Sequence, residues 1–170
     1  MKDRIFLIGY MGSGKSSVGK ELASLLGWKY IDLDASIEFI TGKTISQIFK
    51  QEGESNFRKI ERETLLELAT KKNIVVATGG GCPTYLDNME WMNRNGLTVY
   101  LKTHPGTLFH RLAQDKSNRP LIADLADVDL IEFILSSLKK RLLFYIKSII
   151  TVSGEGIPAV TAQKIVASMK

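Results

Sequence analysis

The sequence lacks the features that would mark a secreted or membrane protein. Its single cysteine, Cys82, cannot form a disulfide within the chain. No apolar run approaches the roughly 18–20 residues of a membrane span, and the first four residues lead through one short apolar run to a glycine loop, unlike a signal peptide. His104 and His110 have no Cys or His partner at a metal-ligand spacing. We therefore expect a cytoplasmic protein with no membrane segment.

The net charge of +5, from 23 basic and 18 acidic residues, suits either nucleic acid or anionic small molecules. The longest basic run is only Lys139-Lys140-Arg141, and the other basic residues are interleaved with acids. No aromatic-rich nucleic-acid signature accompanies them. We expect small anionic substrates and no nucleic-acid partner. A length of 170 residues fits one domain, residues 1–170, which we expect to act as a monomer.

Short apolar runs of strand type alternate with helical patterns along the chain. Several of these runs are almost continuously apolar, as in strands buried on both faces, and they fall at residues 5–8, 29–31, 74–78, 97–101 and 148–152. Helix punctuation lies between them: Gly27 at a C-terminal cap, a Thr44–Gln47 capping box, and a long helix over residues 126–145. The alternation predicts an α/β fold, with a doubly wound parallel sheet between two helix layers.

One glycine-rich segment has the phosphate-binding signature G-x-x-x-x-G-K-[ST], at residues 9–16. It lies between a predicted strand and a predicted helix, as a P-loop requires. Backbone N–H groups and the helix N-terminus would bind phosphate oxygens, Lys15 would reach the β- and γ-phosphates, and Ser16 would ligate Mg²⁺. The motif alone does not separate a kinase from a GTPase or an ATP-driven switch, although no N-K-x-D guanine signature is present.

Two aspartates follow the second predicted strand, Asp32 and Asp34. Ligands of open parallel sheets bind beyond the carboxyl ends of the strands, so both acids should face the phosphate loop. One would hold Mg²⁺ through water, and the other would accept a hydroxyl proton from a substrate. The alternative for Asp34 is a helix N-cap. Residues 79–81 are three consecutive glycines after the third strand, either a loose turn or a place where backbone approaches a ligand closely.

Three arginines are candidates for binding anions. Arg141 lies within an apolar helix stripe, where it requires an anionic partner, in the protein or in a substrate. Arg58 stands three residues before Glu61, which falls on a core-facing stripe; the two form either a plain surface pair or a pair that orients the guanidinium for a substrate. Arg119, in a polar stretch before Pro120, is either a solvated loop residue or one that reaches the transferring phosphoryl group.

Taken together, these residues resemble the shikimate kinase family over essentially the whole chain. The motifs that carry the resemblance, in family order and spacing, are Gly12-Ser-Gly-Lys-Ser16, Asp32-Leu-Asp34, Phe57-Arg58 with Glu61, Thr78-Gly-Gly-Gly81, Arg119-Pro120-Leu121, and Arg141 with Tyr145. The resemblance implies a nucleoside-monophosphate-kinase-like P-loop fold with a five-stranded parallel sheet. It also implies transfer of the ATP γ-phosphoryl group to the 3-hydroxyl of shikimate, on the route to aromatic amino acids.

The resemblance also implies a role for each candidate residue. Catalysis would depend on Lys15, Asp34 and Arg119. ATP would be bound by Gly12, Ser13, Gly14, Lys15, Ser16, Ser17 and Arg119, and shikimate by Asp34, Arg58, Gly80, Gly81 and Arg141. Ser16 would ligate Mg²⁺ directly and Asp32 would support it through water. A substrate-binding helical region would span about 33–62, and a lid about 114–123.

The chain departs from the family pattern at several positions. Leu143 and Ile146 stand where proline and glutamate are frequent, and Tyr10 replaces a frequent phenylalanine; we expect changes in packing only. Residues 153–158 lack an arginine that some members supply to adenine, so adenine contacts would come from backbone with Ile157 and Pro158. Two rival functions remain: a related small-molecule kinase, such as a gluconate kinase, and a nucleotide-binding relative without transferase activity.

Overall fold

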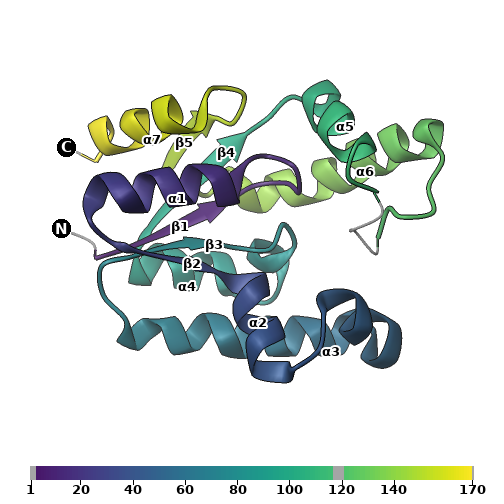
Figure 1. Ribbon diagram of the computed structural model, residues 1–170, viewed down its shortest axis with the longest axis horizontal. Coiled ribbons are helices and arrows are strands. Elements are labelled where there is room, and N and C mark those ends of the chain that lie inside the picture. The colour runs from purple at the N-terminus through teal and green to yellow at the C-terminus, as the bar shows by residue number, and fades with distance from the viewer. Residues whose placement is uncertain (1–2, 117–120, 170) are drawn as a thin grey trace.

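The computed structural model describes residues 3–116 and 121–169. Five parallel strands form one sheet in the order β2-β3-β1-β4-β5 (Figure 1). The strands are β1 (Arg4–Ile8), β2 (Lys29–Asp32), β3 (Ile74–Ala77), β4 (Leu97–Lys102) and β5 (Ile150–Ser153). Each predicted strand agrees with its observed bounds to within two residues. The five-stranded parallel sheet that the resemblance implied is confirmed.

Alternation along the central strand separates two hydrophobic clusters, one on each face of the sheet. Ile5 and Leu7 of β1 point into a cluster completed by α1 (Lys15–Leu26) and α7 (Pro158–Ala167). Phe6 and Ile8 point into the other cluster, which packs against the remaining helices. Those helices are α2 (Leu33–Thr41), α3 (Ile45–Glu67), α4 (Asn88–Asn95), α5 (Pro105–Ala113) and α6 (Asp127–Tyr145). Helices therefore cover both faces of the sheet, as predicted (Figure 1).

The predicted helix signals lie where the helices begin and end. Gly27 caps α1 in the left-handed conformation, with φ 64°. Thr44 and Gln47 form the reciprocal capping box of α3, with bonds of 3.2 and 2.8 Å. Gly53 interrupts α3 with φ 80° and ψ 167°, so that a kink separates its first turns from the segment that carries Arg58.

The strand order places the three candidate loops side by side. β1 pairs with β3, which pairs with β2, and all three run in the same direction. The phosphate loop after β1, the glycine triplet after β3 and Asp32 at the end of β2 therefore meet at one edge of the sheet. The strand order therefore brings together three segments that the sequence singled out.

Close packing of α1 on the sheet requires a residue without a side chain at position 19. A Cβ added to Gly19 would lie 2.7 Å from Cε2 of Tyr30 and 3.2 Å from Cδ1 of Leu7. Gly19→Val should lower the free energy of unfolding by about 2 kcal/mol or more, because the larger side chain forces the helix away from the sheet. Urea denaturation measures the change. The control is Lys20→Val on the exposed face of the same helix, and equal stability of the two variants would contradict the prediction.

Candidate active site

The phosphate loop has the backbone shape that phosphate binding requires. Gly12 and Gly14 have φ values of 78° and 89°, which side-chain-bearing residues rarely adopt. Gly14 is also the N-cap of α1, so the helix begins at Lys15 with its N-terminus towards the loop. The Lys15 ammonium group donates to the carbonyl oxygens of Gly9 and Tyr10, at 2.9 Å each. The loop thus gathers amide donors and an ammonium group around one space.

That space is a cavity of about 440 Å³, here called the nucleotide cavity. From the loop and the start of α1 it is lined by Gly12, Gly14, Lys15, Ser16 and Ser17, as predicted for an ATP site. Ser13 is the exception: it is not among the lining residues, its side chain is buried, and its N–H donates to the Tyr10 carbonyl at 3.1 Å. Ser13 therefore stabilises the conformation of the phosphate loop and does not line the nucleotide cavity.

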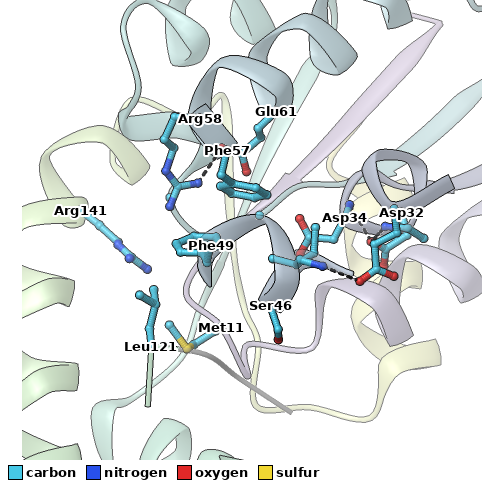
Figure 2. A pocket seen from close by; sticks show the side chains of 16 residues that line it. Met11, Asp32, Asp34, Ser46, Phe49, Phe57, Arg58, Glu61, Leu121 and Arg141 are labelled. Carbon is cyan, nitrogen blue, oxygen red and sulfur yellow. Dashed lines mark hydrogen bonds and ion pairs between the residues drawn. The ribbon is translucent and has the colours of Figure 1, made fainter. Parts of the chain in front are cut away.

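A second cavity of about 440 Å³, here called the acceptor cavity, adjoins the first. Arg58 and Arg141 project into it from different helices, and Asp34 lies across from them (Figure 2). Its walls also include Glu61, Phe49, Phe57, Leu121 and the glycines 79–81. Five residues line both cavities: Met11, Asp32, Asp34, Gly79 and Gly80. Asp34 therefore stands at the junction of the two spaces.

The two aspartates have different tasks. Asp32 is the N-cap of α2: its Oδ1 accepts from the N–H of Asp34 at 3.1 Å and of Ala35 at 3.4 Å. Its Oδ2 accepts from the Ser16 hydroxyl at 3.1 Å and the Tyr30 hydroxyl at 3.0 Å. The cap that sequence reasoning considered for Asp34 is thus supplied by Asp32, which leaves the Asp34 side chain available.

Asp34 carries an oxygen without a partner. Its Oδ1 is buried and has no hydrogen-bond partner among the described residues. Burial raises the pKa of this carboxyl, and the nearby Asp32 raises it further, whereas Lys15 and Arg58 lower it. A shielded acceptor at the junction of two cavities is suited to accept a hydrogen bond from a substrate hydroxyl.

The Arg58–Glu61 pair is buried, not a surface pair. Arg58 Nη1 lies 2.6 Å from Glu61 Oε2, and Nη2 lies 3.1 Å from Glu54 Oε1. Glu61 is fully buried, and its other oxygen, Oε1, has no partner among the described residues. Burial raises the pKa of Glu61 to about 7, although Arg58 opposes the shift. The pair fixes the direction of the Arg58 guanidinium towards the acceptor cavity.

Arg141 is held against the phosphate loop. Its guanidinium lies over the Tyr10 ring, 5.1 Å from the centroid. The Tyr10 hydroxyl is 2.5 Å from the Ser137 hydroxyl, one turn earlier on α6. The tyrosine that replaces a frequent phenylalanine therefore has a partner for its hydroxyl, on the helix that carries Arg141.

The glycine triplet gives the charged side chains room. A Cβ at Gly79 would collide with Glu61 Oε1, and one at Gly81 would collide with the Arg58 guanidinium. A Cβ at Gly80 would lie 3.2 Å from Arg141 Nη1. None of the three glycines has a positive φ, so space, not backbone conformation, explains the triplet. The triplet forms a turn, with the Cys82 N–H donating to the Gly79 carbonyl at 3.1 Å, and it lies against the charged side chains of the cavity.

Sequence reasoning missed Arg111, a lining residue of the nucleotide cavity. Arg111 Nη1 donates to the carbonyls of Gly12 at 2.9 Å and Gly154 at 3.2 Å. No local signal distinguishes it from a surface arginine, because its partners lie 99 and 43 residues away in the sequence.

Gly154, Gly156 and Pro158 also line the cavity, whereas Ile157, an expected adenine contact, is exposed and not among the lining residues. Arg119 lies outside the described residues.

The comparisons with known proteins agree on one family. The family model described as shikimate kinase matches residues 11–170. A shikimate kinase of Bacteroides thetaiotaomicron is 48% identical over 142 residues, covering 84% of this chain and 81% of its own length. A shikimate kinase of Parabacteroides distasonis is 49% identical over 152 residues, covering 89% of this chain and 88% of its own. The chain belongs to the shikimate kinase family.

Solved structures of shikimate kinases support the assignment throughout the fold. The crystal structure of the Bacteroides thetaiotaomicron enzyme has a TM-score of 0.92 and 41% identity, covering 98% of this chain and 97% of its own. A shikimate kinase from Acinetobacter baumannii, in complex with shikimate, has a TM-score of 0.92 and 38% identity, covering 98% and 92%. As a shikimate kinase, the chain is an ATP-dependent kinase that acts on a hydroxyl of shikimate. The gluconate kinase alternative is therefore excluded.

Two further observations concern the membrane and metal predictions. None of the described helices is both long and apolar enough to cross a membrane. Within residues 3–116 and 121–169, no cluster of three or more His, Cys, Asp or Glu side chains could hold a metal ion. The oxygens of Ser16 and Asp32 are hard donors, which suit Mg²⁺ that keeps several waters and binds mainly substrate phosphates.

The buried Glu61 predicts a pH dependence of stability. Its pKa is raised from 4.5 to about 7. Between these two pH values the folded protein therefore binds more protons than the unfolded chain, and the free energy of unfolding falls as the pH rises towards 7. Relative to Glu61→Gln, the wild type should lose about 2 to 3 kcal/mol of unfolding free energy between pH 5 and pH 8. Urea denaturation across this range measures both proteins. Parallel pH profiles would show that Glu61 does not titrate there.

Proposed function

We propose that the protein transfers the γ-phosphoryl group of ATP specifically to the 3-hydroxyl of shikimate, with ATP in the nucleotide cavity and shikimate in the acceptor cavity. The observation that carries the proposal is the junction of the two cavities at Asp34. A hydroxyl held at this junction lies next to the phosphate loop. Catalysis of phosphoryl transfer depends largely on such positioning and on charge stabilisation.

On the acceptor side, two guanidinium groups from different helices bind the shikimate carboxylate. Arg58 and Arg141 line the same cavity, and each is held by protein contacts independent of a ligand. Planar guanidinium groups bind carboxylates in two-point geometry. The backbone of Gly80 and Gly81 contacts the ring, and the unpaired Oδ1 of Asp34 accepts the hydrogen bond of the reacting hydroxyl. Asp34 thereby orients the nucleophile and receives its proton.

On the donor side, Gly12, Gly14, Ser16 and Ser17 present backbone and hydroxyl groups to the triphosphate, and Lys15 moves from the loop carbonyls to the phosphates. Ser16 would hold Mg²⁺ directly and Asp32 through water; both oxygens of Asp32 are already engaged, which favours the indirect role. When bound, the ion neutralises charge on the β- and γ-phosphates. Arg119 stabilises the transferring group when the lid closes.

The lid is proposed at residues 114–123 and the substrate-binding helical region at residues 33–62. Leu121 lines the acceptor cavity, which supports a lid position over the substrate. Closure excludes water that would otherwise accept the phosphoryl group. The monomeric state stays a prediction. The cytoplasmic location stays a prediction.

A coupled assay of ADP release tests the proposal and the rival of a nucleotide-binding protein without transferase activity. Shikimate should stimulate ATP turnover, whereas gluconate should not, because its open chain does not match a pocket for a rigid ring acid. Quinate, which has a different ring, measures how strictly the ring is selected. The position of the product phosphate is then read by NMR. Absence of stimulation by shikimate, or a phosphate on another hydroxyl, would reject the proposed reaction.

Asp34→Asn tests the junction residue. The amide keeps the size of the carboxyl but cannot receive a proton, so kcat should fall by about 10²- to 10⁴-fold, while the KM for ATP stays within a few-fold of wild type. Steady-state kinetics with both substrates separates the two parameters. A variant with wild-type turnover would show that Asp34 is not the acid on the acceptor side.

A further inference from the structure

The segment after β5 forms one wall of the nucleotide cavity. In this segment, residues 154–158 and here called the nucleotide loop, Gly154, Gly156 and Pro158 line the cavity. The Gly154 N–H donates to the Lys102 carbonyl at 2.8 Å, and a Cβ at Gly154 would collide with Thr103 Oγ1. The first residue of the loop is therefore fixed on β4, and the rest of the loop depends on other contacts.

Glu155 supplies such a contact, to the first turn of α5. Its Oε1 accepts from the His104 N–H at 3.1 Å and from the Thr107 hydroxyl at 2.8 Å. His104 is the N-cap of α5, so the carboxylate binds a helix N-terminus, where a negative charge is favourable. The Thr107 and His104 bonds lower the pKa of Glu155, and the carboxylate therefore stays ionised at neutral pH.

The C-terminal end of α5 contacts both the nucleotide loop and the phosphate loop. Arg111, near the last turn of α5, donates to the Gly154 carbonyl and to the Gly12 carbonyl. The helix is thus joined to the nucleotide loop at two points, Glu155 and Arg111. Arg111 and Glu155 differ in one respect: Arg111 lines the cavity, whereas Glu155 does not, although its neighbours Gly154 and Gly156 do.

We propose that Glu155 is a positioning residue for the nucleotide: by fastening the nucleotide loop to α5, it holds two cavity-lining glycines in place and so sets the affinity for ATP. The proposal rests on the location of ATP in the nucleotide cavity. Glu155 has no contact with the acceptor cavity, and its effect should therefore be confined to the nucleotide. Contacts with adenine in this chain then depend on the backbone of the nucleotide loop, which Glu155 holds against α5.

The experiment compares variants of Glu155 and Thr107, together with control variants, by steady-state kinetics and by calorimetric titration with ADP alone. Glu155→Ala should raise the KM for ATP and the Kd for ADP by about five- to twenty-fold, because two hydrogen bonds to a charged acceptor are lost. The kcat and the KM for shikimate should change less than two-fold. Glu155→Gln, which keeps an oxygen acceptor, should recover most of the ADP affinity.

Two further variants separate positioning from a general loss of structure. Thr107→Val removes one of the two donors and should give an intermediate effect, and Glu155→Ala with Thr107→Val should bind ADP no more weakly than Glu155→Ala alone. Glu90→Ala is the matched control, since Glu90 on helix α4 is also an exposed carboxylate, paired with Lys147. It should leave ADP binding unchanged. Circular dichroism verifies that each variant is folded.

Three results would overturn the inference: wild-type ADP affinity in Glu155→Ala, equal increases in the KM for ATP and for shikimate, or additive losses in the double variant. Lys15→Ala distinguishes this failure from a wrong location of the nucleotide. If Lys15→Ala weakens ADP binding and Glu155→Ala does not, only the role of Glu155 is wrong. If neither variant weakens ADP binding, the nucleotide does not occupy this cavity.

Discussion

The acceptor cavity depends on one buried ion pair, between Arg58 and Glu61. Taking charges out of water costs several kcal/mol for each ion, and only close pairing offsets this loss. Arg58 is the main group that lowers the pKa of Glu61, so without Arg58 the rise caused by burial would be opposed less strongly. The pair at 2.6 Å keeps the guanidinium within the cavity. One oxygen of Glu61 has no partner among the described residues, and burial raises the pKa of Glu61 to about 7, so Arg58 offsets the loss of solvent only in part.

The pair in turn requires the glycine triplet and the kinked helix. Side chains at positions 79 and 81 would occupy the space of Glu61 and Arg58, so the two charged groups fit only against bare backbone. The kink at Gly53 gives the second segment of α3, which carries Arg58, a different direction from the first turns of the helix. Arg141 reaches the same cavity by a different route, stacked on Tyr10 of the phosphate loop. The two guanidinium groups thus have independent supports: Arg58 is held by Glu61 of α3, and Arg141 of α6 is held by Tyr10 of the phosphate loop.

Local patterns predicted the fold, and they pointed to residues that the structure brings together around the acceptor cavity, because these signals lie within a few residues. Strand runs, the Thr44–Gln47 box and the stripe that buries Glu61 are all of this kind. The glycine triplet was recognised as a place where backbone approaches a ligand; the structure adds a second reason for it, the room that it leaves for the side chains of Glu61 and Arg58. Arg111 and Glu155 could not be found, because their partners are tens of residues distant and become neighbours only when the strands are ordered. Long-range hydrogen bonds leave no periodic trace in a sequence.

Three departures from the family pattern, at Leu143, Ile146 and Tyr10, have different structural settings. Leu143 on α6 and Ile146, its C-cap, are 66% and 62% exposed, so both substitutions lie at the surface. Tyr10 is fully buried, where an extra hydroxyl without a partner would be costly, and Ser137 supplies that partner from the helix that also carries Arg141. The hydroxyl of Tyr10 in the phosphate loop is therefore satisfied by the helix that carries Arg141. The dependence runs in one direction: Ser137 also donates to the Phe133 carbonyl of its own helix, whereas an apolar residue at position 137 would leave the buried Tyr10 hydroxyl without this partner.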